Sequence, residues 1–458
     1  MRQSDKVQSS SSGKQKLRET YKAQGLTIEK LAQRAYTSVD TIKRLLGTKD
    51  CPNGVERVAV QNISQVLGIQ PTDIVDPQDW YGEESIPVEF QALIQEKIRR
   101  FCGRAFVFEK FQAFIKQHPC GYFTILGEAG IGKSAIAAKY VSDHRCPCFF
   151  NILAEGRNRP EQFLQSLRQQ LKRRYQLTDT EQDDLRGLLE KVAAQIPDQE
   201  RLVVVVDALD EVTQEPGENL LHLPKELPSK VYFLLTRRPY ALENKQLTVS
   251  PGVTTAELDL EGKEYEPYCR QDIEQYLQRW WDEEESLQQW TRERHLDRHT
   301  FVATLADKSE NNFMYLRYVL PDLKAGRYKD LELKELPQGL QEYYQTHWQR
   351  MRMEEAERQM RVMVLFVLVE IGAAVPAQVV ADVLDADIAE VNKVLRDWRE
   401  YLKVRPEDGE DCCTIYHTSF LDFLKGKAEL KPTRKLFREV NQQIVNYQER
   451  ELYRDDHL

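Results

Sequence analysis

Gly127-Glu128-Ala129-Gly130-Ile131-Gly132-Lys133-Ser134 is the stretch that decides the fold of this chain. It fits the phosphate-loop pattern G-x-x-x-x-G-K-[ST] at every position. The apolar segment 122–126 before it is typical of a buried strand, and the segment that begins at Ala135 is typical of a helix. Glycines let the backbone turn tightly enough to point N–H groups at phosphate oxygens, and the helix N-terminus adds a positive dipole end. The stretch predicts a nucleotide site over residues 127–135 in an α/β domain with a parallel sheet.

Two side chains of this loop have expected roles. Lys133 should reach the β- and γ-phosphates of ATP or ADP, and the Ser134 hydroxyl should bind Mg²⁺. A chance glycine-rich turn is the alternative, but a strand before the loop and a helix after it favour the nucleotide site.

A second apolar run supplies candidate acids. Residues 202–206 are typical of a strand buried on both faces, and Asp207-Ala208-Leu209-Asp210-Glu211 follows. Asp207, at the strand's carboxyl end, is expected to hold Mg²⁺, and either Asp210 or Glu211 is expected to polarise the attacking water. A solvated acidic loop is the alternative. A third run, residues 231–235, leads into Thr236-Arg237-Arg238-Pro239, where an arginine could sense the γ-phosphate.

Together these segments resemble the NACHT branch of the STAND NTPases, over about residues 100 to 430. The resemblance places the sensor arginine at Arg238. It departs from the family at Ala105, where an acid is usual, and at Ala208, where glycine is frequent. The further matching segments are Phe101-Cys102-Gly103-Arg104, Asn311-Asn312-Phe313-Met314-Tyr315-Leu316, Leu336-Pro337-Gln338-Gly339-Leu340 and His417-Thr418-Ser419-Phe420-Leu421-Asp422-Phe423-Leu424.

The resemblance implies three more nucleotide-binding residues. Arg104 lies in a motif before the nucleotide domain, and Pro337 is expected near the adenine. In the family, the histidine that matches His417 sits in a winged-helix domain, contacts the β-phosphate of ADP and holds a closed state. From the residues alone, a histidine between Tyr416 and Phe420 could equally be a packed, hydrogen-bonded core residue.

The N-terminal part resembles a Cro/C1-type (Xre) helix-turn-helix domain. Helices are expected over 14–24, 27–35 and 38–46, with a capping box from Thr37 to Asp40 and a closing helix near Ile63. Residues 1–49 contain 11 Lys/Arg and 4 Asp/Glu, a net charge of +7 on a chain of net charge −9. This basic end predicts duplex-DNA binding, with a small protein-binding bundle as the alternative. The expected contact residues on the recognition helix are Ser38, Asp40, Thr41, Lys43 and Arg44.

Length and composition are those of a globular protein of about three domains. Of the 458 residues, 41% are hydrophobic and 30% charged, and the longest apolar run, 362–369, predicts a buried helix rather than a membrane span. The absence of a signal peptide and of metal-type cysteine spacing favours a cytoplasmic protein. The expected parts are a disordered N-terminus (1–13), a helix-turn-helix domain (14–75), a linker (76–98), a NACHT core (99–258), a helical domain (259–345), a winged-helix domain (346–430) and a charged helical tail (431–458).

The resulting hypothesis is a signal-responsive, slow Mg²⁺-dependent ATPase. ADP would hold it closed, and a trigger would let ATP replace ADP and the chain form homo-oligomers, as in bacterial antiphage defence. One alternative is a transcription regulator that uses nucleotide as a structural brake with negligible turnover. Another is a DNA-remodelling ATPase. The family usually carries a large C-terminal repeat sensor, and no tandem repeat is found in this sequence. The trigger and the effector partner cannot be deduced from it.

Overall fold

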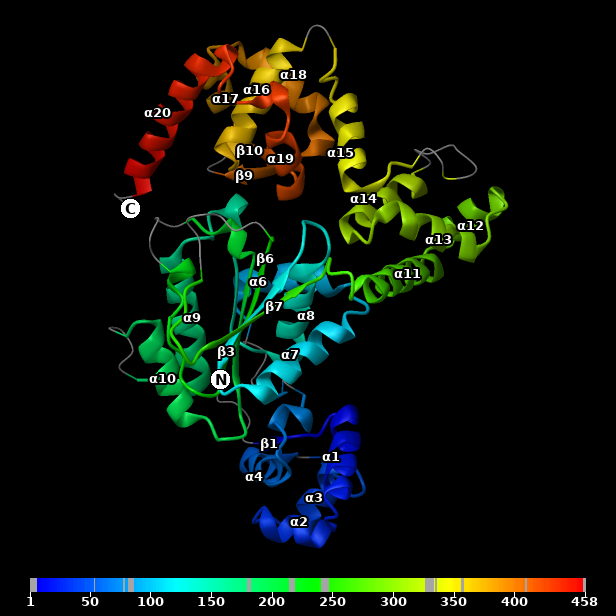
Figure 1. The fold of residues 1–458 in the computed structure, drawn as a ribbon, viewed down its shortest axis with the longest axis vertical. Helices are drawn as coiled ribbons and strands as arrows, with labels where there is room; N and C mark the ends of the chain where they lie inside the picture. The colour runs from blue at the N-terminus through cyan, green and yellow to red at the C-terminus, as the bar shows by residue number, and fades with distance from the viewer. Residues whose placement is uncertain are drawn as a thin grey trace. The chain divides into compact units, whose positions relative to one another are not determined.

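The computed structural model describes residues 6–455 except 53, 77–78, 81–85, 179–182, 214–218, 240–246, 326–332, 334–335, 356–357 and 408–409. Its contacts divide into two compact units, which are described separately (Figure 1). The first unit comprises Met1–Gly127, Lys133–Asn151 and Asn158–Tyr265, and the second comprises Glu128–Gly132, Ile152–Arg157 and Glu266–Leu458.

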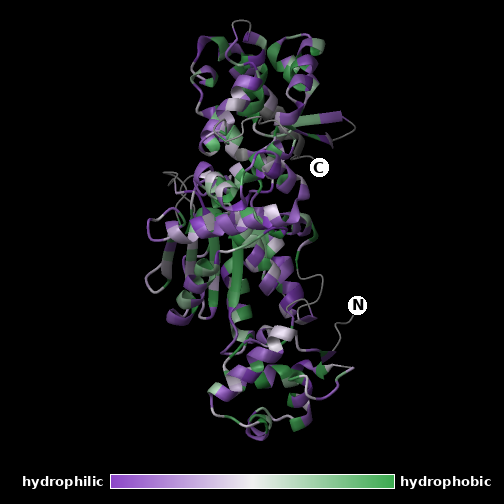
Figure 2. Ribbon diagram, turned by 90° about the vertical axis from the view of Figure 1, so that its right-hand side faces the viewer, coloured by the Kyte–Doolittle hydropathy of each residue, from purple (hydrophilic) through white to green (hydrophobic). Residues whose placement is uncertain are grey.

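A five-stranded parallel sheet forms the centre of the first unit, as the apolar runs predicted. Its order is β4-β5-β6-β3-β7, so that β6 separates the strand before the P-loop from the strand that ends in Asp207. All residues of β3 and β5 are buried, and Figure 2 shows apolar residues concentrated in these strands. The strands are β3 (Gly121–Leu126), β4 (Cys148–Phe150), β5 (Leu202–Asp207), β6 (Val231–Arg237) and β7 (Thr254–Asp259).

Helices cover both faces of this sheet, with α9 and α10 on one side and α7 and α8 on the other (Figure 1). One of the covering helices, α6, falls within the predicted linker 76–98. It packs on α8, and the Phe90 ring lies 5.6 Å from that of Phe149 on β4. Residues 88–98 therefore belong to the core rather than to a linker. The helices are α6 (Val88–Ile98), α7 (Ala105–Gln117), α8 (Lys133–His144), α9 (Pro160–Tyr175) and α10 (Leu185–Gln195).

The N-terminal residues form a helical head with its own apolar cluster, which includes Leu17, Leu31 and Ile42. The head consists of β1 (Lys6–Val7), α1 (Ser11–Ala23), α2 (Ile28–Arg34), α3 (Val39–Leu45), β2 (Val55–Glu56), α4 (Arg57–Leu67) and η1 (Pro71–Asp73).

Two predictions about the head were wrong. Residues 6–13 are not disordered, because β1 pairs with β2 and Ser10 caps α1. The cap of α3 is Ser38 rather than Thr37, because the Ser38 side chain accepts the Thr41 N–H at 3.0 Å.

The second unit is helical, with a small antiparallel sheet of order β8-β10-β9. The order helix α16, strand β8, helices α17 and α18, then the β9–β10 hairpin is the predicted winged-helix arrangement. The apolar run 362–369 forms the buried part of α16, as expected. The elements are α11 (Glu266–Glu283), α12 (Glu285–Glu293), α13 (Arg298–Ser309), α14 (Phe313–Lys324), α15 (Gly339–Arg350), α16 (Gln359–Ile371), β8 (Val375–Pro376), α17 (Ala377–Leu384), α18 (Ile388–Asp397), β9 (Leu402–Glu407), β10 (Glu410–Ile415), α19 (Thr418–Lys425) and α20 (Arg438–Asp455).

The predicted tail 431–458 is helical, and its first part packs against the rest of the C-terminal unit. Phe437 is fully buried and stacks on Phe366 of α16, and Val440 and Ile444 of α20 are also buried. The beginning of the tail is therefore part of the C-terminal core. Within the described ranges, no helix combines the length and hydropathy that a bilayer span requires.

Candidate nucleotide site and DNA-binding head

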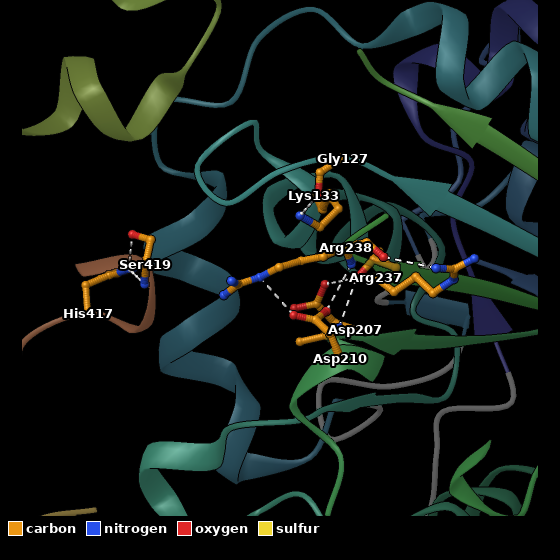
Figure 3. A network of polar contacts seen from close by, with 10 residues as sticks. Gly127, Lys133, Asp207, Asp210, Arg237, Arg238, His417 and Ser419 are labelled. Atoms are coloured by element: carbon orange, nitrogen blue, oxygen red, sulfur yellow. Dashed lines mark hydrogen bonds and ion pairs between the residues drawn. The ribbon is translucent and has the colours of Figure 1, made fainter. Parts of the chain in front are cut away.

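The P-loop runs from the end of β3 to the start of α8. Gly130 and Gly132 have φ angles of 88° and 104°, which favour glycine because a Cβ would be strained there. Lys133 is the first residue of α8, and its Nζ donates a 2.6 Å hydrogen bond to the Gly127 carbonyl (Figure 3). The ammonium group is thus held over the loop by the loop's own backbone, in position for the phosphates expected there.

The apex of the P-loop is held by the N-terminus of α14. The Phe313 and Met314 N–H groups donate to the Gly130 carbonyl at 3.0 and 3.3 Å. The Asn312 Nδ2 donates to the Ala129 carbonyl at 2.8 Å, while its Oδ1 caps α14. A Cβ at Gly130 would lie 2.3 Å from Asn312 Oδ1, so only glycine permits this approach. Residues 128–132 accordingly belong to the second unit by their contacts.

Asp207 lies at the end of β5, with 4% of its surface exposed. Its Oδ1 accepts a 2.5 Å hydrogen bond from the Thr236 hydroxyl, which in turn accepts the Ala208 N–H at 2.9 Å. The Asn151 Nδ2 donates to the Asp207 carbonyl at 2.7 Å. Burial raises the pKa of Asp207, while hydrogen bonds with Thr236 and Ser134 and the charge of Lys133 oppose the rise. A buried carboxylate of this kind favours a cation beside it.

The oxygen donors here fit magnesium. Ser134 supplies a hydroxyl and Asp207 a carboxylate, the hard oxygen ligands that Mg²⁺ takes together with phosphate oxygens and water. Among the described residues, no cluster of three or more His, Cys, Asp or Glu could hold a metal by itself. A Mg²⁺ held by Ser134 and Asp207 would take its remaining ligands from phosphate oxygens and water.

The other two acids are distinguished by their partners. Asp210 forms an ion pair with Arg238, 3.0 Å from Oδ2 to Nε, and also accepts the Arg238 backbone N–H at 3.2 Å (Figure 3). The neighbouring Arg237 pairs instead with Glu257 of β7 at 2.8 Å. Glu211 ends the short helix η4 (Leu209–Glu211), where its carbonyl accepts from Asn158. The predicted sensor Arg238 is thus paired with Asp210, one of the two candidate bases, and the other candidate, Glu211, is not part of that pair.

His417 is the N-cap of α19 and is half-buried. Its Nδ1 accepts the Ser419 N–H at 3.0 Å, so the neutral ring carries its proton on Nε2. The Ser419 hydroxyl lies 2.8 Å from the same Nδ1, 2.6 Å from the Tyr344 hydroxyl and 3.2 Å from the Met314 sulfur. A second histidine of this part, His347, is buried among Tyr343, Tyr401 and Phe420.

The remaining predicted nucleotide residues are buried. Arg104 is 2% exposed and precedes α7 in a left-handed conformation, with φ of 63°. Pro337 is buried, and its carbonyl accepts a 2.7 Å hydrogen bond from the Tyr315 hydroxyl on α14. Pro337 thus lies in the same helical part as the clasp on the P-loop apex.

On the head, the predicted DNA-contact residues share the α3 helix and its cap. Lys43 and Arg44 are exposed. The Ser38 and Thr41 hydroxyls lie 2.9 Å apart, and Asp40 pairs with Lys49. The cap and the Asp40–Lys49 pair hold the start of α3 in shape, while the exposed cations are the groups suited to phosphates.

Some residues of the nucleotide site were missed from the sequence. Thr236 was quoted only as part of the arginine motif, although its hydroxyl bridges Asp207 and Ala208. Asn312 stands only in one of the segments that carry the family resemblance, and Asn151 stands in none of the quoted motifs. An Asn before an apolar helix is an N-cap signal, but nothing in the sequence links Asn312 to Ala129, 183 positions away.

A P-loop after one parallel strand and a buried acid after another define a P-loop NTPase fold. Residues 122–284 match the NACHT domain family, and residues 16–79 match the Cro/C1-type HTH DNA-binding domain. The chain therefore contains a NACHT domain preceded by a Cro/C1-type helix-turn-helix domain, and these two domains imply nucleotide binding and DNA binding.

Solved structures with similarity include the RuvB Holliday junction branch migration motor of Thermotoga maritima and a chain of the Drosophila ORC bound to DNA. The RuvB similarity has 10% identity and a TM-score of 0.23, and covers 77% of this chain and 97% of that one. The ORC similarity has 11% identity and a TM-score of 0.28, and covers 73% and 98%. Because the TM-scores are below 0.5, nothing about this chain follows from them. No curated protein gives a significant match.

Proposed function

We propose that this NACHT protein is an ATP/ADP-dependent switch whose nucleotide state controls its C-terminal unit. The observation that carries the proposal is the clasp of Asn312 and the α14 N-terminus on the P-loop apex. Met314, in the first turn of α14, also contacts Ser419 of the histidine motif. The apex of the P-loop is therefore bonded to α14, and α14 also contacts Ser419, two residues after His417.

Each residue has a distinct part in the proposed reaction. Lys133 binds the β- and γ-phosphates, and Ser134 and Asp207 hold Mg²⁺, which neutralises charge on the transferred phosphoryl group when bound. Glu211 orients the attacking water and accepts its proton, because the Asp210 carboxylate is already engaged by Arg238. Arg238 exchanges Asp210 for the γ-phosphate when ATP is present.

The closed state is proposed to contain ADP. The Nε2–H of His417 donates to the β-phosphate, and this bond opposes opening of the winged-helix part. A trigger opens the protein, ATP replaces ADP, the open form oligomerises, and slow hydrolysis resets the switch. The resemblance to bacterial NACHT proteins supports a role in antiphage defence, with the basic head bound to duplex DNA.

A transcription regulator with negligible turnover is the second candidate. The Asp210–Arg238 pair favours it, because it occupies both the predicted sensor and one candidate base. Binding to palindromic duplexes, together with no measurable ATP hydrolysis, would support this candidate over the first.

The nucleotide site is tested with Lys133→Ala. The change removes the charge that meets the phosphates, so affinity for fluorescent ADP or ATP should fall at least about tenfold, on the order of 1.4 kcal/mol. Lys139→Ala is the matched control, because Lys139 lies on the same helix, is partly exposed and pairs with Asp143 one turn further along. Unchanged affinity in a folded Lys133→Ala protein would remove the nucleotide assignment.

A further inference from the structure

The four helices α1–α4 of the head end in the same way. Two or three residues beyond the end of each helix, one residue donates its N–H to a carbonyl five positions earlier. The residue before it donates three positions back, the pattern of a Schellman motif. The residue at the left-handed position of this motif is Gly25 after α1, Gly47 after α3 and Gly68 after α4, with φ angles of 65°, 71° and 66°.

Helix α2 is the exception, because its left-handed position is occupied by Tyr36. The Tyr36 N–H donates to Gln33 at 3.3 Å, the Thr37 N–H donates to Ala32 at 3.0 Å, and φ of Tyr36 is 49°. The geometry is the same as at the three glycines. At Gly25 and Gly68 an added Cβ would meet nothing within 4 Å, so glycine is used there for its conformation and not for lack of space.

Tyr36 is therefore strained and contributes no packing in return. A bulky side chain in the left-handed region is disfavoured, and 93% of the Tyr36 surface is exposed. Strained residues persist where function requires the side chain. The position also indicates which function, because Tyr36 lies two residues before Ser38, the cap of the predicted recognition helix α3.

The charged residues that precede and follow Tyr36 in the sequence indicate what kind of molecule it contacts. Arg34 precedes it, and Lys43 and Arg44 follow on α3, all three exposed. A phenol hydroxyl is one of the neutral groups that donate to phosphate oxygens and so fix a protein's register on a duplex. A tyrosine just before a recognition helix that carries exposed cations matches the phosphate backbone that borders the major groove.

We propose that Tyr36 is a DNA-contact residue whose hydroxyl donates to a backbone phosphate and positions α3 in the major groove. The inference rests on the DNA-binding role of the head and adds a residue that was not among the predicted contacts. Since the contact is to phosphate, it acts on any duplex sequence.

The test uses the full chain and a fluorescein-labelled, mixed-sequence DNA duplex, with anisotropy titrations between about 50 and 200 mM salt. Tyr36→Gly should weaken binding about tenfold, since a hydrogen bond to a charged group is lost. It should also raise the unfolding midpoint of the head, because the strain is relieved. A variant that is more stable yet binds less tightly cannot owe its loss to misfolding.

Three further variants complete the test. Tyr36→Phe keeps the ring and should lose as much affinity as Tyr36→Gly. Because tyrosine is neutral, Tyr36→Phe and Tyr36→Gly should leave the slope of log affinity against log salt concentration unchanged. Lys43→Ala removes a charge and should lower the magnitude of that slope by about one. Gly25→Tyr places the same strain after α1 and should lower stability with unchanged DNA affinity.

Two outcomes overturn the proposal and differ from each other. If the wild-type protein binds the duplex and Tyr36→Gly binds it equally well, the Tyr36 contact is wrong while the DNA-binding head stands. If the wild-type protein does not bind duplex DNA even at the lowest salt, the DNA-binding role itself fails.

Discussion

The loops after strands β3 and β4 differ from those after β5 and β6. Residues 128–132, after β3, and 152–157, after β4, belong by their contacts to the C-terminal unit. At the ends of β5 and β6, Thr236 bonds to Asp207, and just after these strands Arg238 pairs with Asp210, all within the sheet unit. The half of the site with the proposed metal-binding and hydrolytic residues is therefore bonded within the sheet unit, whereas the P-loop apex is bonded to a helix far along the chain.

This difference indicates where chemistry and switching can be separated. A change among the β5 and β6 loops should alter turnover and leave the C-terminal unit unaffected. A change in the contacts of the β3 and β4 loops should alter the response of the C-terminal unit to nucleotide.

The largest expected effect is on hydrolysis. Glu211→Gln should bind ATP and hydrolyse it about 100-fold more slowly, because general bases contribute on the order of 10²–10⁴ in rate. Asp210→Asn should slow turnover less, since it weakens the pair with Arg238 but leaves the proposed base. Phosphate release under saturating ATP measures both. Wild-type turnover in Glu211→Gln, with loss in Asp210→Asn, would transfer the base role to Asp210.

A smaller effect is expected at the P-loop clasp. Asn312→Asp keeps the oxygen that caps α14 but removes the Nδ2 donor to Ala129. The change also adds a negative charge beside the P-loop, which repels phosphates, so ADP affinity should fall about tenfold in fluorescence titrations.

A second helix cap provides the control for this variant. Asp387 caps α18 by accepting the Ala389 N–H, as Asn312 caps α14 by accepting the Met314 N–H. Asp387→Asn exchanges the same two side chains in the opposite direction and should leave ADP affinity unchanged. If Asn312→Asp also binds ADP like the wild type, the clasp does not shape the phosphate site.

The sequence motifs of the site could be predicted, and its long-range contacts could not. The P-loop and Asp207 directly follow apolar runs that are typical of buried parallel strands. Their places at the ends of strands can therefore be predicted from the adjacent sequence. The clasp joins Asn312 to Ala129 and depends on how α14 packs. The left-handed conformation of Tyr36 could not be predicted either. Helix propensity does not reveal that this tyrosine occupies the position where the other three head helices have glycine.

The smallest effect concerns the loop after β4. Glu155, in the short helix η3 (Leu153–Glu155), pairs with Arg405 of β9 at 2.5 Å. Burial alone would raise the pKa of Glu155, but the hydrogen bond and charge of Arg405, with Arg157 and Lys403, outweigh it and hold the pKa below its ordinary 4.5. A lowered folded-state pKa stabilises the protein above the unfolded-state value and ceases to do so as pH falls through the folded-state value.

Glu155→Gln should therefore cost about 1 kcal/mol or less near neutral pH, as the pair is partly exposed. The difference in unfolding free energy from the wild type should shrink towards zero as pH falls below 4.5. Urea unfolding at several pH values measures this. A difference that stays constant across the range would show that Arg405 does not act through the Glu155 charge.

The central claim is that nucleotide is sensed by the C-terminal unit through His417. Because His417 caps α19, alanine would remove a cap as well as the proposed phosphate donor. His417→Asn keeps a capping side chain and removes the imidazole Nε2–H. A charge-assisted hydrogen bond contributes roughly 1.5–3 kcal/mol, so its loss should weaken ADP binding about tenfold or more.

The most direct measurement is the unfolding temperature of the wild type and of His417→Asn, each with and without ADP. Ligand binding stabilises the folded state in proportion to the logarithm of ligand concentration over Kd. We expect similar unfolding temperatures without ADP and a clearly smaller ADP-induced increase in His417→Asn. An increase as large in His417→Asn as in the wild type would contradict the central claim.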